Sequence, residues 1–435
     1  MSQGGTDLYR DGAPLVNLIL ARLPASLVLA TVAFVPAVLA ADAAPATPEA
    51  KAPASFEDAL TGGDAQLEFR YRIESVDQDP FADDALASTL RSRLNYRTLE
   101  YHGWSLFAEV DNNTVIGDDE DYNSTTNGIT DRPIIADPEY TEVNQAYLQF
   151  KTGALTGIGG RQRITLDDHR FIGNVGWRQN EQTYDALTFK GSPRQGIQLH
   201  YSWIANVNRV FGPDEGSQSA NFHGAMHALN GKADLGKAGA LTAYGYLLDI
   251  ENAPALSSQT FGLQWTGTYP LAATAKLNWI AAYASQRDTG DNPNDYSADY
   301  YRLEGGATRG PLGLKAGYEV LGGDDTPNHA FQTPLATLHA FQGWADKFLT
   351  TPTGGVTDLY VGAMGNLGPV ALQLVWHDFE AEAFSRAYGS EWDASATYKF
   401  GAKKNYEALL KFADYQADGF AADTTKVWVQ FSATF

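Results

Sequence analysis

Residues 90–97 read LRSRLNYR, and two kinds of side chain alternate along them. One set of positions holds Leu90, Leu94 and Tyr96, and the other holds Arg91, Arg93, Asn95 and Arg97. Because successive side chains of a β-strand point to opposite faces, this segment would form a strand with one apolar face and one arginine face.

The same alternation recurs from residue 66 onward, in segments of about ten residues. In residues 391–400, Trp392 and Tyr398 fall on one face, while Glu391 and Asp393 fall on the other. Similar segments are 65–74, 104–111, 197–204, 260–267, 276–283, 312–320 and 426–435. Segments 222–232 and 241–250 alternate poorly, which leaves the strand count open by about two.

The connections between these segments alternate in length. Short ones fall near 98–103, 152–154, 192–195, 235–239, 269–274, 309–311, 366–369 and 401–405. Longer polar ones fall near 76–86, 113–140, 164–184, 205–221, 251–258, 287–298, 322–356, 380–388 and 416–424. Short turns on one side and long loops on the other are typical of bacterial outer-membrane barrels. The sequence therefore predicts an all-β fold, a transmembrane antiparallel β-barrel of about 18 strands with short periplasmic turns and long extracellular loops.

Both ends of the chain agree with this location. Residues 1–40 read as a secretory signal peptide, with an apolar run after Arg22 and small residues at Val38 and Ala40. Residues 41–65 form an Ala/Pro-rich periplasmic lead, of which 41–55 are predicted to be disordered, and residues 66–435 form the barrel. The last strand alternates and stops on Phe435, which resembles the C-terminal signal recognised by the outer-membrane barrel assembly machinery.

Composition excludes several classes of function. The chain has 52 acidic residues against 31 Lys and Arg, a formal charge of -21, so a surface for nucleic acid is not expected. It has no cysteine, which excludes disulfides, thiolate metal sites and cysteine nucleophiles. No Ser/His/Asp set of familiar spacing stands out, and we expect no enzyme, metal or cofactor site.

The arginine faces indicate where the chemistry lies. An arginine facing lipid near mid-bilayer would cost about 2–4 kcal/mol, so these faces should line the lumen. The predicted lumen arginines of the strands are Arg70, Arg72, Arg91, Arg93, Arg97, Arg161 and Arg163. Guanidinium groups pair bidentately with carboxylates, so this wall suits an acidic solute. The alternative is that the arginines neutralise Glu68, Glu74, Glu109 and Asp111 in a packed polar lining.

Two longer stretches carry a resemblance to a known family. Residues 160–189, GRQRITLDDHRFIGNVGWRQNEQTYDALTF, and residues 331–352, FQTPLATLHAFQGWADKFLTTP, resemble the alginate-export family of outer-membrane proteins. The resemblance implies a monomeric barrel with an electropositive constriction and an anionic polyuronate as cargo. It also makes Arg161, Arg163, Arg170 and Arg178 possible pore contacts. The second stretch lies in the longest loop, which could fold inward as a constriction or gate.

The leading interpretation is a passive outer-membrane channel for an anionic saccharide, in contact with outer-membrane lipid and lipopolysaccharide. A general porin for other small solutes is the alternative, and a barrel hydrolase and a blocked structural barrel are further ones. About 18 strands leave an aqueous channel unless a loop fills it, which disfavours the blocked barrel. The sequence does not decide between export and import.

Overall fold

The structure is a computed structural model, and it describes residues 53–435. The predicted signal peptide lies outside this range. In the periplasmic lead, helix α2 (Phe56–Thr61) is capped by the Ser55 side chain, which accepts a hydrogen bond from the Asp58 amide. The sequence pattern did not predict this short helix, which the cap and the packing of Ala59 fix, and the predicted disorder of residues 41–55 ends before it.

Eighteen strands form one sheet. The first nine are β1 (Asp64–Gln78), β2 (Ala85–Arg97), β3 (Trp104–Val115), β4 (Tyr140–Thr152), β5 (Leu155–Gln162), β6 (Thr183–Arg194), β7 (Ile197–Asn208), β8 (Asn221–Asp234) and β9 (Ala240–Ile250). The others are β10 (Ser258–Ala272), β11 (Ala275–Asp288), β12 (Ser297–Arg309), β13 (Leu312–Leu321), β14 (Val356–Leu367), β15 (Val370–Glu380), β16 (Ala387–Phe400), β17 (Tyr406–Ala417) and β18 (Thr424–Thr434). Short 3-10 helices are η1 (Gly236–Ala238), η2 (Pro254–Leu256) and η3 (Leu338–Ala340).

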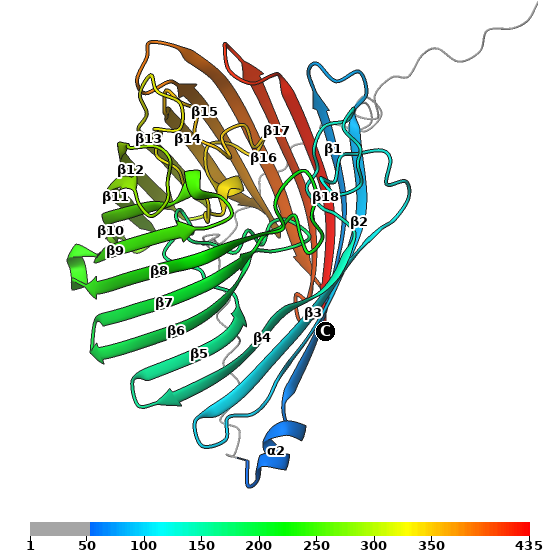
Figure 1. The fold of residues 1–435 in the computed structure, drawn as a ribbon, viewed down its shortest axis with the longest axis vertical. Helices are drawn as coiled ribbons and strands as arrows, with labels where there is room; N and C mark the ends of the chain where they lie inside the picture. Colours follow the sequence, from blue (N-terminus) through cyan, green and yellow to red (C-terminus); the bar gives the residue numbers. More distant parts are fainter. Residues whose placement is uncertain (1–52) are drawn as a thin grey trace, which may run out of the picture.

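Each strand pairs antiparallel with its neighbours in sequence, and β1 also pairs with β18, so the sheet closes into a barrel (Figure 1). The predicted strand number is confirmed, and the poorly alternating segments form β8 and β9. Short turns and long loops lie at opposite ends, as predicted. None of the helices in residues 53–435 is long and apolar enough to span a membrane.

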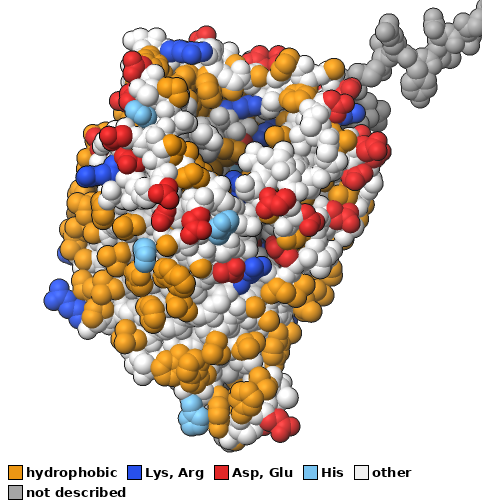
Figure 2. Space-filling view, viewed as in Figure 1, with side chains coloured by type: hydrophobic (Ala, Val, Ile, Leu, Met, Phe, Trp, Pro, Cys, Tyr) orange, Lys and Arg blue, Asp and Glu red, His pale blue; other side chains and the backbone are white. Residues whose placement is uncertain are grey.

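The two faces of β2 separate as its sequence predicts. Leu94 is 55% exposed on the outer face, whereas Arg91 and Arg93 are 1% and 7% exposed on the lumen face. Figure 2 shows hydrophobic side chains over much of the outer surface and acidic ones near the ends of the long loops. The apolar outer face is the surface that a barrel presents to lipid.

The lumen is not empty. We call residues 163–182, between β5 and β6, the first inner loop, and residues 322–355, between β13 and β14, the second inner loop. Buried apolar side chains of both loops, such as Ile172, Phe331 and Phe348, pack in one hydrophobic cluster with inward residues of the strands. In Figure 1, η3 of the second inner loop lies between the two sides of the barrel. The second stretch therefore folds inward, one of the two roles expected for it.

Candidate functional site: the lumen constriction

The two inner loops contact each other inside the barrel. Ile172 and Leu335 form a parallel bridge between them, and the Gly173 amide donates to the Leu335 carbonyl at 2.9 Å. The Thr337 amide donates to the His169 carbonyl at 3.0 Å. These backbone contacts join segments far apart in sequence, so the constriction is a single body built from both loops.

Arg70 and Arg72 of β1 hold the backbone of the first inner loop. Arg70 Nη1 donates to the carbonyls of Gly176, Trp177 and Arg178 at 3.1, 3.2 and 3.1 Å. Arg72 Nη2 donates to the Trp177 carbonyl at 2.5 Å, and its guanidinium carbon lies 4.3 Å from the Trp177 ring centroid. Both arginines point inward as predicted, and they position the loop.

The arginines of β2 are paired with acids on the neighbouring strands. Arg91 forms an ion pair with Glu68 of β1. Arg93 donates from Nε and Nη2 to the two carboxylate oxygens of Asp111 on β3, at 2.7 and 2.6 Å. This is the bidentate geometry in which a guanidinium pairs most strongly with a carboxylate. The wall is thus a packed polar lining here, the alternative that the sequence left open.

Glu181, at the end of the first inner loop, joins several of these groups. It pairs with Arg163 and, at 3.1 Å, with Arg93, and it accepts a hydrogen bond from Asn144 at 2.6 Å. Burial alone would raise the pKa of Glu181, but the two guanidinium groups hold it well below its usual range. Asn144 also donates to Glu109 at 2.8 Å, so the wall acids and the loop share one network.

Arg178 is the main cation of the first inner loop. It lies 2.9 Å from Glu74 of β1, 3.7 Å from Asp137 and 3.3 Å from Asp346 of the second inner loop. Burial would lower the pKa of Arg178, but these three carboxylates raise it well above the usual value. Arg178 therefore bridges both loops and the wall, and removing it would leave the buried Glu74 without its ion-pair partner, whereas Asp137 and Asp346 would keep Arg72 and Lys426.

On the opposite wall, Arg170 and Arg302 form a second group of ion pairs. Arg170 lies 2.6 Å from Glu319 of β13 and donates to Thr333 of the second inner loop at 3.0 Å. Arg302 of β12 lies 2.6 Å from Asp168 of the first inner loop. The body formed by the two loops is therefore held from both sides of the barrel.

Lys411 of β17 is enclosed by aromatic rings from the wall and both loops. Its Nζ lies 3.8 Å from the ring centroid of Trp344, 4.0 Å from that of Trp177 and 5.2 Å from that of Trp428. Nζ also lies 2.5 Å from His339 Nε2. A cation over several aromatic faces is attracted by each of them, so Lys411 fastens both loops to β17.

His339 completes this contact as a neutral ring. Its Nδ1 lies 2.7 Å from Asp346 Oδ1. The imidazole ring stacks on the Trp177 ring, and the two ring planes are 6° apart. Burial lowers the pKa of His339 to about 3, although Asp346 acts in the opposite direction. Nδ1 therefore donates to Asp346 while Nε2 accepts from Lys411.

Several of these residues were not singled out from the sequence: Arg302, Glu319, His339, Asp346 and Lys411. His339 and Asp346 lie inside the 331–352 stretch that carries the family resemblance, and Lys411 lies on the lumen face of an alternating strand. The strand signal was therefore present for Lys411, but its aromatic partners come from loops whose path the sequence pattern does not give.

Arg161 does not point inward as predicted. It pairs in register with Asp185 of β6, and the two side chains form an ion pair at 2.8 Å. Asp185 shares the outer face of β6 with Leu187, which is 47% exposed, whereas Gln162 of β5 is buried on the lumen side. The strand around it contains Gly157, Gly159 and Gly160, so no apolar alternation marks its faces.

Arg97 differs from the other lumen arginines. It lies at the periplasmic end of β2, with its guanidinium carbon 4.7 Å from the Phe107 ring centroid, and it donates to the Tyr147 hydroxyl at 2.9 Å. Within residues 53–435, no carboxylate lies within ion-pair distance of Arg97. Of the predicted arginines, it is the one that neither holds a loop nor pairs with an acid.

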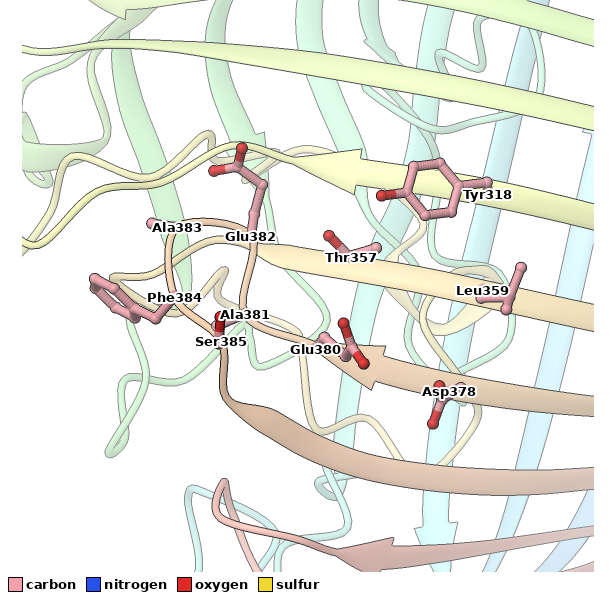
Figure 3. A pocket seen from close by; sticks show the side chains of 10 residues that line it. All are labelled: Tyr318, Thr357, Leu359, Asp378, Glu380, Ala381, Glu382, Ala383, Phe384 and Ser385. Atoms are coloured by element: carbon pink, nitrogen blue, oxygen red, sulfur yellow. The ribbon is translucent and has the colours of Figure 1, made fainter.

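A cavity of about 410 Å³ lies away from the constriction, beside the loop between β15 and β16 (Figure 3). It is lined by Tyr318, Thr357, Leu359, Asp378, Glu380, Ala381, Glu382, Ala383, Phe384 and Ser385. Tyr318 and Leu359 are 47% and 44% exposed on the outer face of the barrel. The cavity is thus a groove on the outer surface near the extracellular end, outside the lumen.

Comparisons with known proteins agree with this geometry. The family model described as alginate export matches residues 63–328. Among solved structures, Pseudomonas aeruginosa OpdL is similar at 14% identity and a TM-score of 0.67, over 86% of this chain and 99% of that one. Acinetobacter baumannii OccAB2 is similar at 14% identity and a TM-score of 0.69, over 87% and 99%. No curated protein sequence matches the chain. At these identities the structures show a shared barrel fold.

Proposed function

The chain belongs to the alginate export family and is a channel of the bacterial outer membrane, not an enzyme, and we propose that it passes an anionic saccharide or polyuronate. Family membership is the observation that carries the choice of cargo. Guanidinium and ammonium groups concentrated on the lumen face support it, since they suit uronate carboxylates.

The ion pairs of the lumen limit how this selectivity could arise. Arg91, Arg93 and Arg178 are bound to acids, so their charge is largely balanced at the constriction. A solute would make weak and repeated contacts with partly satisfied donors, which is what passage through a channel requires. The cations without buried acidic partners, such as Arg97, would contribute most of the preference for anions.

The balance of charge is also the observation that favours a second candidate, a general porin for other small solutes. A neutralised constriction would select mainly by size. The two candidates differ in whether a uronate carboxylate is recognised in addition to the sugar ring.

The test compares two saccharides of similar length on the purified protein in a planar bilayer. We expect a hexamer of galacturonate to block the ionic current at a concentration at least about tenfold lower than maltohexaose does, a difference of about 1.4 kcal/mol. Equal block by the charged and neutral hexamers would contradict the proposal and favour the general porin.

We further propose that the chain works as a monomer. Every strand from β1 to β18 pairs within the barrel, so residues 53–435 leave no sheet edge for a second copy. The apolar outer face would contact lipid and lipopolysaccharide, and β18, which ends the sheet, would be the segment recognised by the assembly machinery.

A further inference from the structure

Five cationic residues lie at the periplasmic ends of neighbouring strands, beside the short turns. We call them the basic arc: Arg97 of β2, Lys151 of β4, Lys190 of β6, Lys232 of β8 and Lys276 of β11. Each lies within five residues of one of the short turns. Because these strands follow one another around the barrel, the five residues cover one continuous side of the periplasmic mouth.

The alternation of the strands places these side chains on the lumen face. Lys190 lies on the same face of β6 as Thr188, which is fully buried and shares a hydrogen bond with the Ser202 hydroxyl. Leu187 and Phe189 are exposed on the opposite, outer face. Lys232 likewise follows Asn230, which is 7% exposed and hydrogen-bonds Asp167 of the first inner loop.

The other three members follow the same rule. Lys276 lies on the same face of β11 as Ile280 and Ala282, which face Arg170 and Arg302 inside the barrel. Lys151 lies on the same face of β4 as Tyr147, which accepts a hydrogen bond from Arg97 in the lumen. The exposed Leu148 lies on the opposite, outer face. The five cations therefore lie on the lumen face at the periplasmic mouth.

Unlike the arginines of the constriction, the arc is only weakly paired. Lys151 lies 3.9 Å from Glu100, and both side chains are about half exposed. In the described chain, Arg97, Lys190, Lys232 and Lys276 have no carboxylate within ion-pair distance. Asp64 lies opposite Arg97 in the β1–β2 register but makes no ion pair with it, so the arc keeps an excess of positive charge.

The extracellular end has the opposite sign. Besides Asp137, which is buried against Arg178, the connection 116–139 contains Asp118, Asp119, Glu120, Asp121, Asp131 and Glu139 against the single cation Arg132. The eight short turns, in contrast, contain Glu100 as their only acid and Lys237, Lys403 and Lys404 as cations. An anion would be repelled at the outer end and attracted at the periplasmic end.

We propose that the basic arc is a capture site for polyanions that enter the barrel from the periplasm. The site would take a chain of carboxylate or phosphate groups, held by several lysines and Arg97 at once, and deliver it to the inner loops. This inference rests on the proposed function for the identity of the natural cargo, but the capture of polyanions from one side does not depend on a sugar. The arc changes rates of capture and release, and the concentration gradient sets the direction of net flow.

The experiment measures block of single channels from each side separately. The chain has no cysteine, so Gln218→Cys in the exposed connection between β7 and β8 can be labelled from one side with a bulky maleimide to identify the orientation of each channel. Inorganic tripolyphosphate serves as a polyanion without sugar, and hexagalacturonate serves as the uronate.

The variant replaces Lys151, Lys190, Lys232 and Lys276 with Gln and leaves Arg97 in place. Its matched control carries Gln at Lys237, Lys403 and Lys404, three cations of the short turns that lie outside the arc. Exposed lysines of this kind contribute little to stability, so both variants should fold.

For the natural chain we expect tripolyphosphate to block about tenfold faster from the periplasmic side than from the extracellular side at low salt. The arc variant should lose this difference, and the control should retain most of it. Equal rates from both sides, absence of block by tripolyphosphate, or an unchanged rate in the arc variant would overturn the proposal. Sided block by tripolyphosphate without preferential block by hexagalacturonate would uphold the capture site and reject the uronate cargo.

Discussion

The constriction and the basic arc use the same kinds of side chain in opposite ways. Arg93 and Arg178 are buried against carboxylates at 2.6 and 2.9 Å, and their role is to fix the inner loops. Lys190 and Lys232 lie exposed at the periplasmic mouth. The difference shows that a count of lumen arginines does not locate the selective field, because burial with an acid turns a cation into a structural element.

The largest effect should come from breaking the ion pairs of Arg178. Arg178→Ala would leave Glu74 buried without its ion-pair partner, which typically costs about 3–5 kcal/mol, and would remove one of the cations beside Asp346. We expect the inner loops to detach, with a larger and noisier single-channel conductance. The control is Lys399→Gln, which removes an exposed pair with Glu407 at 3.3 Å and should leave the conductance unchanged. A normal conductance in Arg178→Ala would show that the loops are held without this residue.

A smaller loosening is expected when the aromatic enclosure of Lys411 loses its cation. Lys411→Met keeps the length of the side chain but removes the attraction to three rings, each worth about 0.5–2 kcal/mol, and leaves His339 Nε2 without its donor. We expect brief openings above the normal current level. If the recordings match those of the natural chain, packing alone holds the loops to β17.

Acid should loosen the same contact. The pKa of His339 is lowered to about 3 in the folded chain by burial, so between pH 6.5 and pH 3 only the unfolded or detached state binds the proton, and stability falls as the pH falls. His169, whose pKa burial also lowers, acts in the same direction. Lowered carboxyl pKa values, such as that of Glu181, take effect only below about pH 4.5.

Current noise measured between pH 6.5 and 4.5 in the natural chain and in single histidine variants tests the contribution of each histidine. Noise should rise over this interval in the natural chain and in His169→Gln, and the rise should be much smaller in His339→Gln. A rise of the same size in His339→Gln would assign it to another group.

Arg97→Glu should change selectivity with the least change in structure. Because Arg97 has no acidic partner in the described chain, its replacement breaks no ion pair, and we expect a shift of the zero-current potential toward cations with normal heat resistance. The double change Arg91→Glu with Arg93→Glu would place new acids beside Glu68 and Asp111. It would therefore disturb the constriction itself and is a less direct test of selectivity.

The strands could be predicted from sequence because lipid and lumen impose a period of two along each of them. The alternation around Arg91 and Leu94 gave the faces of β2 correctly, but the glycines before Arg161 left no such pattern, and its predicted direction was wrong. The ion pairs could not be predicted, because partners such as Arg170 and Glu319 are 149 residues apart and meet only through the path of the inner loops. The strand pattern places the cations of the basic arc on the lumen face. It does not show that the arginines of the constriction are paired with acids while the cations of the arc are only weakly paired.

The zero-current potential under a KCl gradient tests this account most directly, with the natural chain and the four-lysine arc variant compared in the same bilayer. The account predicts a preference for chloride in the natural chain that is reduced or lost in the variant, with the single-channel conductance staying similar. A preference for potassium in the natural chain, or the same chloride preference in both, would contradict the claim that the weakly paired cations of the periplasmic mouth set the selectivity of this channel.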